Sequence, residues 1–265
     1  MNNLINKAVN LIESNRISST EVADVLGKKG QINNVYPLNR SHFKVGEVVF
    51  VYAINNSNYE LHKQIAELDL TDKILFVYNV NCDRAIFGDL VTKYIMLYKR
   101  AKAIVVTGKL RDAHTLIKEN YPIWCETVSP IGCVNYINGE DINVDSYNEL
   151  YEQYNGAIMV CDDSGVVMIP KTELNEHLLK KLEFIEFQED IWFYCLDTLK
   201  MSTFEIVCQK KYLTENLLDK RLLEKLEKFQ LLLACSVISL GILFSSMIFD
   251  SFFPFLILPK LFKSL

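Results

Sequence analysis

Short apolar segments alternate with amphipathic ones through the first two-thirds of the chain, and this alternation limits its fold more than any other feature. Four segments are rich in β-branched and aromatic residues, as buried strands are; they are 46–52, 73–78, 103–107 and 123–125. Three segments between them carry apolar residues at helical spacing; they are 59–68, 90–102 and 113–119. Because strands and helices alternate, the sequence predicts an α/β domain built in layers.

Further signals stand on both sides of this pattern. Residues 1–27 predict helices, the second of which opens with a capping signal at 18–21. The turn residues at 162–165, with apolar runs on both sides, predict a hairpin. From 171 to about 226 the pattern is helical and highly charged.

The composition excludes several classes of protein. A chain of 265 residues can bury one sizeable core, and its net charge of −5 gives it no general attraction to nucleic acid. The seven cysteines form no CxxC pair and no ligand spacing with the four scattered histidines. We therefore expect reduced, buried thiols. The N-terminus has no signal-peptide core, so we expect a cytoplasmic domain.

Acidic residues and an arginine stand at the ends of the predicted elements. The Gly-Asp pair at 88–89 precedes a predicted helix, where unpaired backbone N–H groups and the helix dipole favour an anion. The Arg-Asp pair at 111–112 follows the strand 103–107, which Gly108 is expected to end. Loops at the carboxyl ends of strands are the usual place for a ligand in α/β sheets. Two carboxylates and an arginine at such a place can hold a metal ion beside a small carboxylate ligand. The alternatives are that the Arg-Asp pair is only a surface ion pair and that the Gly-Asp pair is only a helix cap.

Four blocks of the sequence, taken in order, resemble the RraA-like family over residues 15–210. That family includes proteins similar to the regulator of ribonuclease activity and to 4-hydroxy-4-methyl-2-oxoglutarate aldolase/oxaloacetate decarboxylase. The blocks are 17–27 (ISSTEVADVLG), 88–91 (GDLV), 106–112 with 121–124 (VTGKLRD and YPIW), and 161–170 (CDDSGVVMIP). Two departures exist: 21 residues, one more than usual, separate Asp89 from Arg111, and Thr115 stands where some members have an acid.

The resemblance implies a fold of α/β/α layers, assembled as a trimer or a pair of trimers with active sites at subunit interfaces. It implies a divalent metal that Asp112 ligates directly and that Asp89 helps to hold through bound water. A C-terminal glutamate donated by a neighbouring subunit completes the water shell, and Glu189 is the match in this sequence.

The resemblance also implies the substrate contacts. Arg111 would grip the substrate carboxylate and counter the developing charge. At the turn that begins with Gly88, the backbone amides of Leu90 and Val91 would bind the other end of the pyruvyl unit.

The implied activity is that of a class II, metal-dependent aldolase or decarboxylase. Retro-aldol cleavage of a 4-hydroxy-2-oxo acid and decarboxylation of oxaloacetate both leave a pyruvate enolate. A hard cation, Mg²⁺ or alternatively Mn²⁺, can share that charge. Lys109, beside Arg111, is interpreted as a solvated lysine rather than a Schiff-base group. The alternative function is a non-catalytic regulator of the ribonuclease-inhibitor type. That branch lacks the aspartate that corresponds to Asp112, so the presence of Asp112 favours an enzyme.

The segment 229–249 is the second informative feature, because its 21 residues carry no charge. A helix of that length spans the hydrocarbon core of a bilayer, about 30 Å. Basic residues in 220–228 precede it, and fewer follow the second apolar run, 251–258, which places the preceding domain in the cytoplasm. We therefore divide the chain into a catalytic domain over 1–215 and a membrane-anchored tail over 216–265. The alternative for the tail is an extra helix buried in an oligomer interface.

Overall fold

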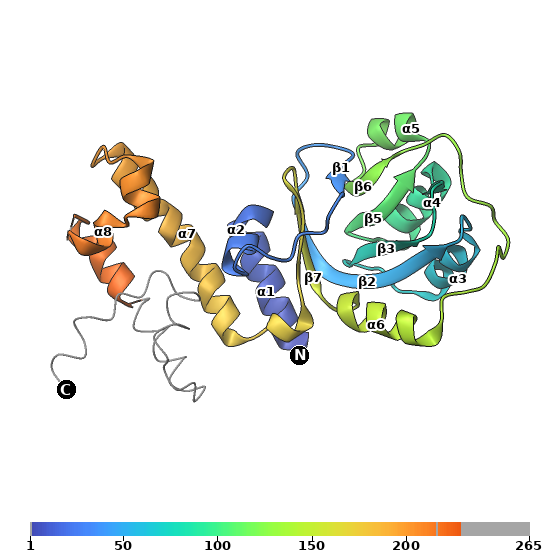
Figure 1. Cartoon of the computed structure of the whole chain (residues 1–265), viewed down its shortest axis with the longest axis horizontal. Coiled ribbons are helices and arrows are strands. Elements are labelled where there is room, and N and C mark those ends of the chain that lie inside the picture. The colour runs from blue at the N-terminus through green and yellow to red at the C-terminus, as the bar shows by residue number, and fades with distance from the viewer. Residues whose placement is uncertain (1, 216, 229–265) are drawn as a thin grey trace. The chain divides into compact units, whose positions relative to one another are not determined.

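The structure of the chain, a computed structural model, describes residues 2–215 and 217–228. Contacts divide the chain into two compact units, Met1–Asn175 and Glu176–Leu265. The described strands lie in the first unit: β1 (Tyr36–Pro37), β2 (Lys44–Ile54), β3 (Ile74–Val80), β4 (Ala85–Phe87), β5 (Ala103–Leu110), β6 (Ile123–Val128), β7 (Ile158–Asp162) and β8 (Gly165–Ile169). Its helices are α1 (Asn2–Asn15), α2 (Ser19–Val25), α3 (Tyr59–Glu67), α4 (Asp89–Lys93), η1 (Tyr94–Tyr98), α5 (Ala113–Lys118), α6 (Val144–Tyr154) and η2 (Lys171–Glu173) (Figure 1).

The strands form one sheet in the order β1-β6-β5-β3-β2-β7-β8, and β4 pairs with β5. The central strands β2, β3, β5 and β6 run parallel, whereas β1 at one edge and the β7–β8 hairpin at the other are antiparallel. Parallel neighbours need crossover connections. Helix α3 connects β2 to β3, and α5 connects β5 to β6. The alternation of strand and helix in the sequence therefore reflects the parallel centre of the sheet.

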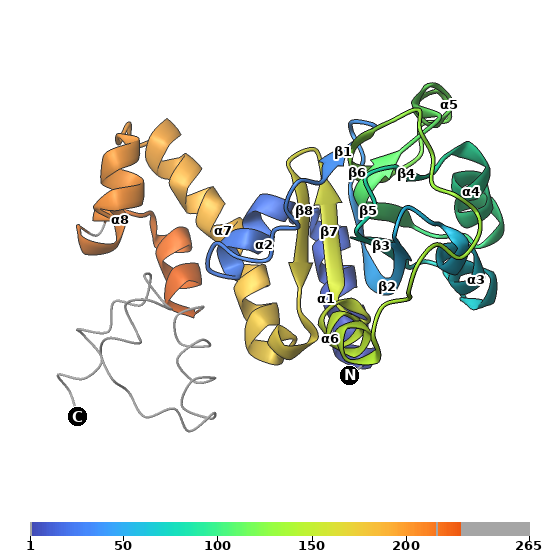
Figure 2. The same cartoon turned by 45° about the vertical axis from the view of Figure 1, so that its right-hand side comes forward.

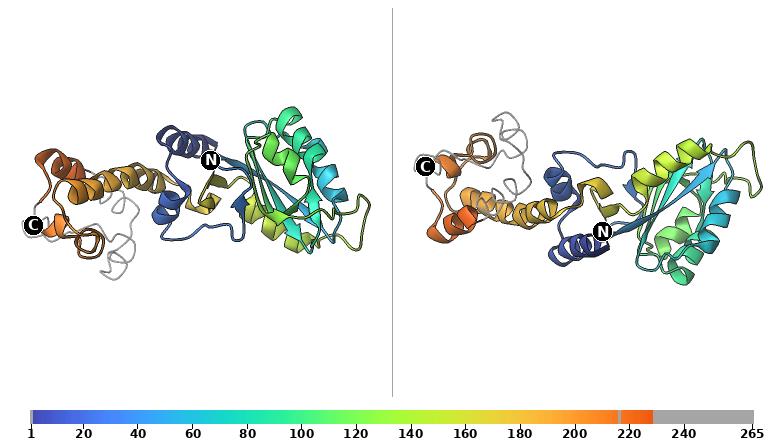
Figure 3. Two further views of the ribbon diagram at one scale, coloured as in Figure 1. Left: turned by 90° about the horizontal axis from the view of Figure 1, so that it is seen from above. Right: turned by 90° about the horizontal axis from the view of Figure 1, so that it is seen from below.

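Successive side chains on the parallel strands point to opposite faces of the sheet and build two separate cores. On β2, Val51 packs in the core that contains Leu61 of α3, together with residues of α4 and α5. Its neighbour Phe50 packs in the other core, where its ring stacks on Tyr154 of α6 at 5.9 Å between centroids. Helices α3, α4 and α5 thus cover one face and α6 covers the other (Figures 2 and 3). This arrangement confirms the predicted α/β/α layers.

The predicted cap of α2 and the predicted hairpin are both present and are linked to each other. The Ser18 hydroxyl accepts a hydrogen bond from the Glu21 N–H at 3.2 Å, and the Glu21 carboxylate accepts one from the Ser18 N–H at 2.7 Å. The Asp162 carboxylate, at the turn between β7 and β8, accepts hydrogen bonds from the N–H and the hydroxyl of Ser19, each at 2.7 Å. One carboxylate therefore joins the helix to the hairpin.

The expectation that Gly108 ends its strand is wrong. β5 continues to Leu110, because the short strand β4 adds to its carboxyl-terminal half and pairs Phe87 with Leu110. A Cβ on Gly108 would lie 2.8 Å from Cδ1 of Ile86. The glycine therefore makes room for β4 and does not stop β5.

The predicted helix over 90–102 is shorter and less regular than expected. One turn of α-helix, α4, is followed by the π-helical turn η1, in which the Lys99 N–H donates to the Tyr94 carbonyl at 3.0 Å. The helix ends there, and Arg100 takes a positive φ of 53°. Helix α6 was not predicted from the sequence.

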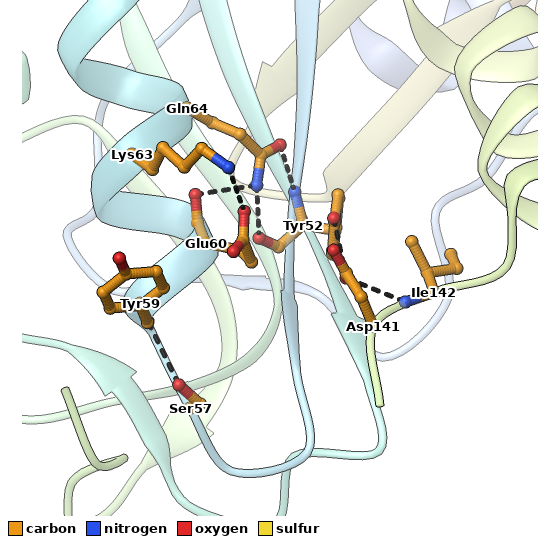
Figure 4. Close-up of polar contacts among 8 residues, drawn as sticks. All are labelled: Tyr52, Ser57, Tyr59, Glu60, Lys63, Gln64, Asp141 and Ile142. Atoms are coloured by element: carbon orange, nitrogen blue, oxygen red, sulfur yellow. Dashed lines mark hydrogen bonds and ion pairs between the residues drawn. The ribbon is translucent and has the colours of Figure 1, made fainter. Parts of the chain in front are cut away.

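The segment between β6 and α6, residues 129–143, is held by isolated backbone pairings and by side-chain hydrogen bonds rather than by a helix or an extended strand. The Tyr52 hydroxyl donates to the Asp141 carboxylate at 2.9 Å. Gln64 of α3 bonds both the N–H and the carbonyl of Tyr52, at 3.3 and 3.1 Å (Figure 4). Burial and the Asp141 carboxylate raise the pKa of Tyr52 above its ordinary value, so the hydroxyl keeps the proton that it donates.

The described part of the second unit is helical, as the charged pattern predicts. It contains α7 (Glu176–Asp197), η3 (Phe204–Cys208), α8 (Lys211–Thr214) and a further helix over 220–228. Ile191 and Cys195 of α7 pack with Tyr212 and Leu222 in one apolar core. The division between the units falls after Asn175. A catalytic domain that extends to residue 215 stays a prediction.

The predicted membrane segment 229–249 and the second apolar run 251–258 lie outside the described residues. Within residues 2–215 and 217–228, no helix has the length and apolar character needed to cross a bilayer.

Candidate functional site

The two predicted motifs meet at one edge of the sheet, because β4 and β5 are parallel neighbours. Phe87 ends β4, Leu110 ends β5, and the two residues are paired in register. The pairs 88–89 and 111–112 follow these strand ends directly. The Arg111 N–H donates to the Phe87 carbonyl at 2.9 Å and extends the pairing into the loops. The structure thus brings together the glycine turn and the Arg-Asp pair, as predicted.

The Asp112 carboxylate is fixed by hydrogen bonds to neighbouring loops and does not cap its helix. It occupies the N-cap position of α5, yet its side chain makes no capping hydrogen bond. Its backbone is left-handed, with φ 57° and ψ 32°, a conformation that Asn and Asp tolerate better than most residues. Its Oδ2 accepts hydrogen bonds from the Asp89 N–H and from Arg111 Nε, both at 3.2 Å. The side chain is 33% exposed, so a ligand can reach it.

Gly88 provides the space in which this carboxylate lies. A Cβ at position 88 would stand 1.9 Å from Oδ2 of Asp112 and 2.8 Å from its Cγ, well inside the 3.0 Å that real Cβ contacts respect. The Gly88 backbone has φ −141° and ψ −145°, which is outside the left-handed region. The requirement for glycine is therefore steric. The carboxylate lies directly on the backbone where α4 begins.

The Arg111 guanidinium lies between the Asp112 carboxylate and the 129–143 segment. Its Nε donates to Asp112, and a Cβ on Gly132 would stand 3.0 Å from its Nη1. The Arg111 side chain is 50% exposed. Neighbours on two sides thus position the guanidinium while it stays open to a ligand. The sequence alone does not predict the role of Gly132, because no spacing relates it to the Arg-Asp pair.

The amides predicted to bind substrate lie in the first turn of α4. The Leu90 N–H donates to Oδ1 of Asp89 at 2.7 Å. Asp89 thus binds the amide at the start of its own helix, as the simpler interpretation of the Gly-Asp pair expects. The Leu90 side chain is 78% exposed and the Val91 side chain 7%. A substrate oxygen that binds the Leu90 amide must therefore displace the Asp89 carboxylate, which would free Asp89 for another partner.

Asp112 and Asp89 are the donors that this site offers to a metal ion. Among the residues that the structure describes, no three His, Cys, Asp or Glu side chains gather in a metal-binding cluster. Mg²⁺ commonly binds one or two carboxylates and completes its shell with water and substrate oxygens. The two carboxylates fit such an ion better than a structural Zn²⁺, which needs a closed set of four protein ligands. Glu189 lies on α7 in the second unit, and its contribution stays a prediction.

The fold and the site together define a layered α/β/α protein with an Arg-Asp pair held against a glycine turn. A family model described as RraA-like, Aldolase/RraA, matches residues 19–168. The match covers more than half of the chain, and the chain belongs to the RraA-like family. The resemblance carried by the four sequence blocks is thereby confirmed.

Two relatives show how far the likeness extends. Protein DlpA of Legionella pneumophila is 24% identical over 188 residues, which cover 65% of this chain and 29% of that protein. The chain thus spans under a third of the length of DlpA. A protein of Halalkalibacterium halodurans named "Putative 4-hydroxy-4-methyl-2-oxoglutarate aldolase" is 29% identical over 166 residues, 62% of this chain and 78% of that protein.

Solved structures share the fold. Streptomyces coelicolor RraAS2, described as an unusual member of the RNase ES inhibitor RraA protein family, has a TM-score of 0.54 and 20% identity, over 69% of this chain and 96% of that one. An uncharacterized protein from Pseudomonas syringae pv. tomato has a TM-score of 0.52 and 19% identity, over 72% of this chain and 86% of that one. The family therefore includes proteins named as aldolases and proteins named as ribonuclease inhibitors.

Proposed function

We propose that this protein is a divalent-metal-dependent lyase that acts on small 2-oxo acids. The reaction is aldol cleavage of 4-hydroxy-4-methyl-2-oxoglutarate, decarboxylation of oxaloacetate, or both. The observation that carries the proposal is the Asp112 carboxylate, which leaves α5 uncapped and lies against Gly88 and Arg111. The aldolase name of the Halalkalibacterium relative and the family description support the proposal.

Each site residue has a defined role in this proposal. Asp112 would hold the cation directly, and Asp89 would hold it through bound water. When bound, a divalent cation supplies Lewis-acid polarisation of the substrate's 2-oxo group. Arg111 binds the substrate carboxylate, because a planar guanidinium matches a carboxylate with two parallel hydrogen bonds. The amides of Leu90 and Val91 donate to the remaining oxygens at the positive end of α4.

Both reactions break a carbon–carbon bond and leave an electron pair on the carbon that becomes the methyl group of pyruvate. Arg111 stabilises the negative charge that develops as this bond breaks. Asp89, exposed at the start of α4, orients the water through which a proton is exchanged. Arg111 thus supplies the positive charge of the reaction, and Asp89 supplies the carboxylate that takes part in proton exchange.

The competing function is binding and inhibition of a ribonuclease without catalysis. The Streptomyces neighbour is described as an unusual member of the RNase ES inhibitor RraA protein family. A surface that only binds another protein needs no carboxylate held beside a glycine turn. The geometry of Asp112 therefore supports the enzyme. Inhibition of a ribonuclease by this protein, in the absence of any lyase activity, would reverse that preference.

Metal removal tests the proposed function directly. A chelator should abolish pyruvate release from oxaloacetate, and excess Mg²⁺ or Mn²⁺ should restore it, because so few protein ligands hold such ions loosely. A lactate dehydrogenase assay measures the pyruvate released. The rate of oxaloacetate decarboxylation by the metal ion without the protein is subtracted. Activity that survives complete metal removal contradicts the metal-dependent mechanism.

The helices that follow the two motifs in the chain, η1 and α5, carry exposed apolar side chains, which support a subunit interface near the site. Leu97 and Tyr98 of η1 are 56% and 73% exposed, and Ile117 of α5 is 53% exposed. We expect the chain truncated after Lys228 to be a trimer or a hexamer by light scattering. Leu97→Glu should shift it towards monomer with loss of lyase activity, because a charge in an apolar interface is costly. A fully active monomer of the unsubstituted protein contradicts the shared site and the predicted role of Glu189.

We also propose, on the sequence alone, that residues 229–249 anchor the chain in a membrane. The full-length protein should sediment with membranes and resist extraction by high salt and alkaline carbonate, because burial in hydrocarbon does not depend on charge screening. Truncation after Lys228 should release an active protein, since it retains Leu222 and Leu226, which are buried in the second unit. Full-length protein that stays in solution without detergent makes the tail a helix buried in the oligomer instead.

A further inference from the structure

Two cysteines that are far apart in the sequence face each other beside the site. Cys82 lies in the turn between β3 and β4, and Cys133 lies in the 129–143 segment. Both are free thiols. The Cys133 thiol donates to the Arg84 carbonyl at 4.0 Å, so it reaches the turn that contains Cys82. Each thiol is the largest influence on the pKa of the other. No close spacing such as CxxC predicts this pair, because the fold joins two distant parts of the sequence.

Backbone hydrogen bonds hold the two cysteines in this position. The Cys133 N–H donates to the Ala85 carbonyl at 2.8 Å, which ties Cys133 to β4. The Asn56 N–H donates to Sγ of Cys82 at 3.3 Å. The carbonyl of the same Asn56 accepts a hydrogen bond from the Val134 N–H at 2.9 Å. One residue thus connects Cys82 to the neighbour of Cys133, so the thiols meet through the fold and not by a chance side-chain conformation.

We propose that Cys82 and Cys133 form a reversible intramolecular disulfide when the protein encounters a peroxide. In the first step, the Cys82 thiolate attacks one peroxide oxygen, the O–O bond breaks, hydroxide leaves, and Cys82 becomes a sulfenic acid. In the second step, the Cys133 sulfur attacks Sγ of Cys82, the S–O bond breaks, and water leaves with the Cys133 proton. The two thiols lose two electrons together, and the peroxide gains them.

The surroundings of the two thiols assign these different roles. The neighbouring Cys133 thiol lowers the pKa of Cys82, and the Cys82 thiol together with burial raises the pKa of Cys133. Cys82 is therefore the thiolate that reacts first, and Cys133 is the resolving thiol. Because Cys82 is only 7% exposed, only an oxidant as small as peroxide reaches it. Burial raises the pKa of Cys125 and of Cys161, so these thiols resist the same reaction.

The disulfide would act on the site through Gly132. A disulfide holds the two sulfurs about 2.0 Å apart, and we expect its formation to shift the Cys133 backbone. Gly132 precedes Cys133, and its α-carbon faces the Arg111 guanidinium so closely that a Cβ there would stand 3.0 Å from Nη1. This step rests on the proposed function, in which Arg111 binds the substrate carboxylate. Oxidation should therefore raise KM for oxaloacetate severalfold, and reduction should reverse the change.

Peptide mapping of the full-length protein tests the disulfide itself. After treatment with hydrogen peroxide, free thiols are blocked with N-ethylmaleimide and the protein is digested without reductant. We expect a linked pair of peptides that carries Cys82 and Cys133 and that dithiothreitol separates. Cys133→Ser should instead leave a sulfenic acid on Cys82 that dimedone traps, and Cys208→Ser, at an exposed cysteine of the second unit, should leave the linked pair unchanged. Cys82 and Cys133 that both remain alkylated while Cys208 is oxidised overturn the proposal.

Kinetics of the same samples separate this proposal from the proposed function. If peptide mapping shows the disulfide but KM for oxaloacetate is unchanged, the disulfide does not act on Arg111, and that part of the proposal is overturned. A protein without lyase activity in either redox state contradicts the proposed function, while the peptide map still decides whether the disulfide forms.

Discussion

Asp112→Asn is expected to remove nearly all lyase activity and to leave the fold intact. Asparagine tolerates the left-handed backbone at this position, φ 57°, so the substitution removes a charge without adding backbone strain. The neutral amide is a poor ligand for a divalent cation. Mutation of a residue that only supports a metal ligand typically lowers metal affinity or activity by about 10–100-fold. Loss of the ligand itself should therefore lower kcat/KM for oxaloacetate by more than about a hundredfold. Steady-state kinetics at saturating Mg²⁺ measure the loss, and thermal unfolding checks the fold.

Two further variants separate the metal from the substrate contact. Asp112→Ala should lose as much activity and also unfold at a lower temperature, because alanine in the left-handed region costs about 1–2 kcal/mol. Arg111→Ala keeps the carboxylate and should still bind Mn²⁺ in a titration, while losing about 3–4 kcal/mol of transition-state stabilisation. Wild-type kcat/KM in Asp112→Asn would show that this carboxylate is not a ligand, and the proposed lyase mechanism would fail.

The layers, and the meeting of the two motifs at one sheet edge, could be predicted because the local sequence pattern agrees with the tertiary environment there. The parallel strands are buried on both faces, so they appear in the sequence as short apolar runs such as 104–106. Once these runs are located, the pairs 88–89 and 111–112 stand at strand ends, where an α/β sheet places its ligands. The agreement of four motifs with one family added the roles that no single motif carries.

The rest depends on contacts between residues far apart in the sequence. Gly108 resembles a strand end until Ile86 of β4 is placed against it. Helix α6 escaped prediction because tyrosines such as Tyr147 and Tyr154 pack on Phe50 where the pattern would need aliphatic residues. Gly132 has no motif at all, and its proximity to the arginine appears only after the 129–143 segment is folded. These features are set by packing partners that the sequence does not place.

Gly88→Ala is expected to reduce both stability and activity, because the added methyl group and the Asp112 carboxylate cannot occupy the same space. The Cβ would stand 1.9 Å from Oδ2 of Asp112, and such overpacking typically costs about 1–3 kcal/mol. If the carboxylate moves aside by about 1 Å, the loss in kcat/KM should be about a hundredfold. Thermal unfolding and oxaloacetate kinetics of the same sample measure the two effects.

Two controls show whether the methyl group acts through the carboxylate. Gly27→Ala places a Cβ where no atom lies within 4 Å, at a φ of 75°, so it should cost about 1–2 kcal/mol of stability and leave kcat/KM unchanged. The double variant Gly88→Ala/Asp112→Ala should be more stable than the sum of the two single changes predicts, because removal of the carboxylate makes room for the methyl group. It should remain inactive, since the ligand is gone. Purely additive losses of stability would show that the glycine serves the backbone of α4 and not the approach of Asp112.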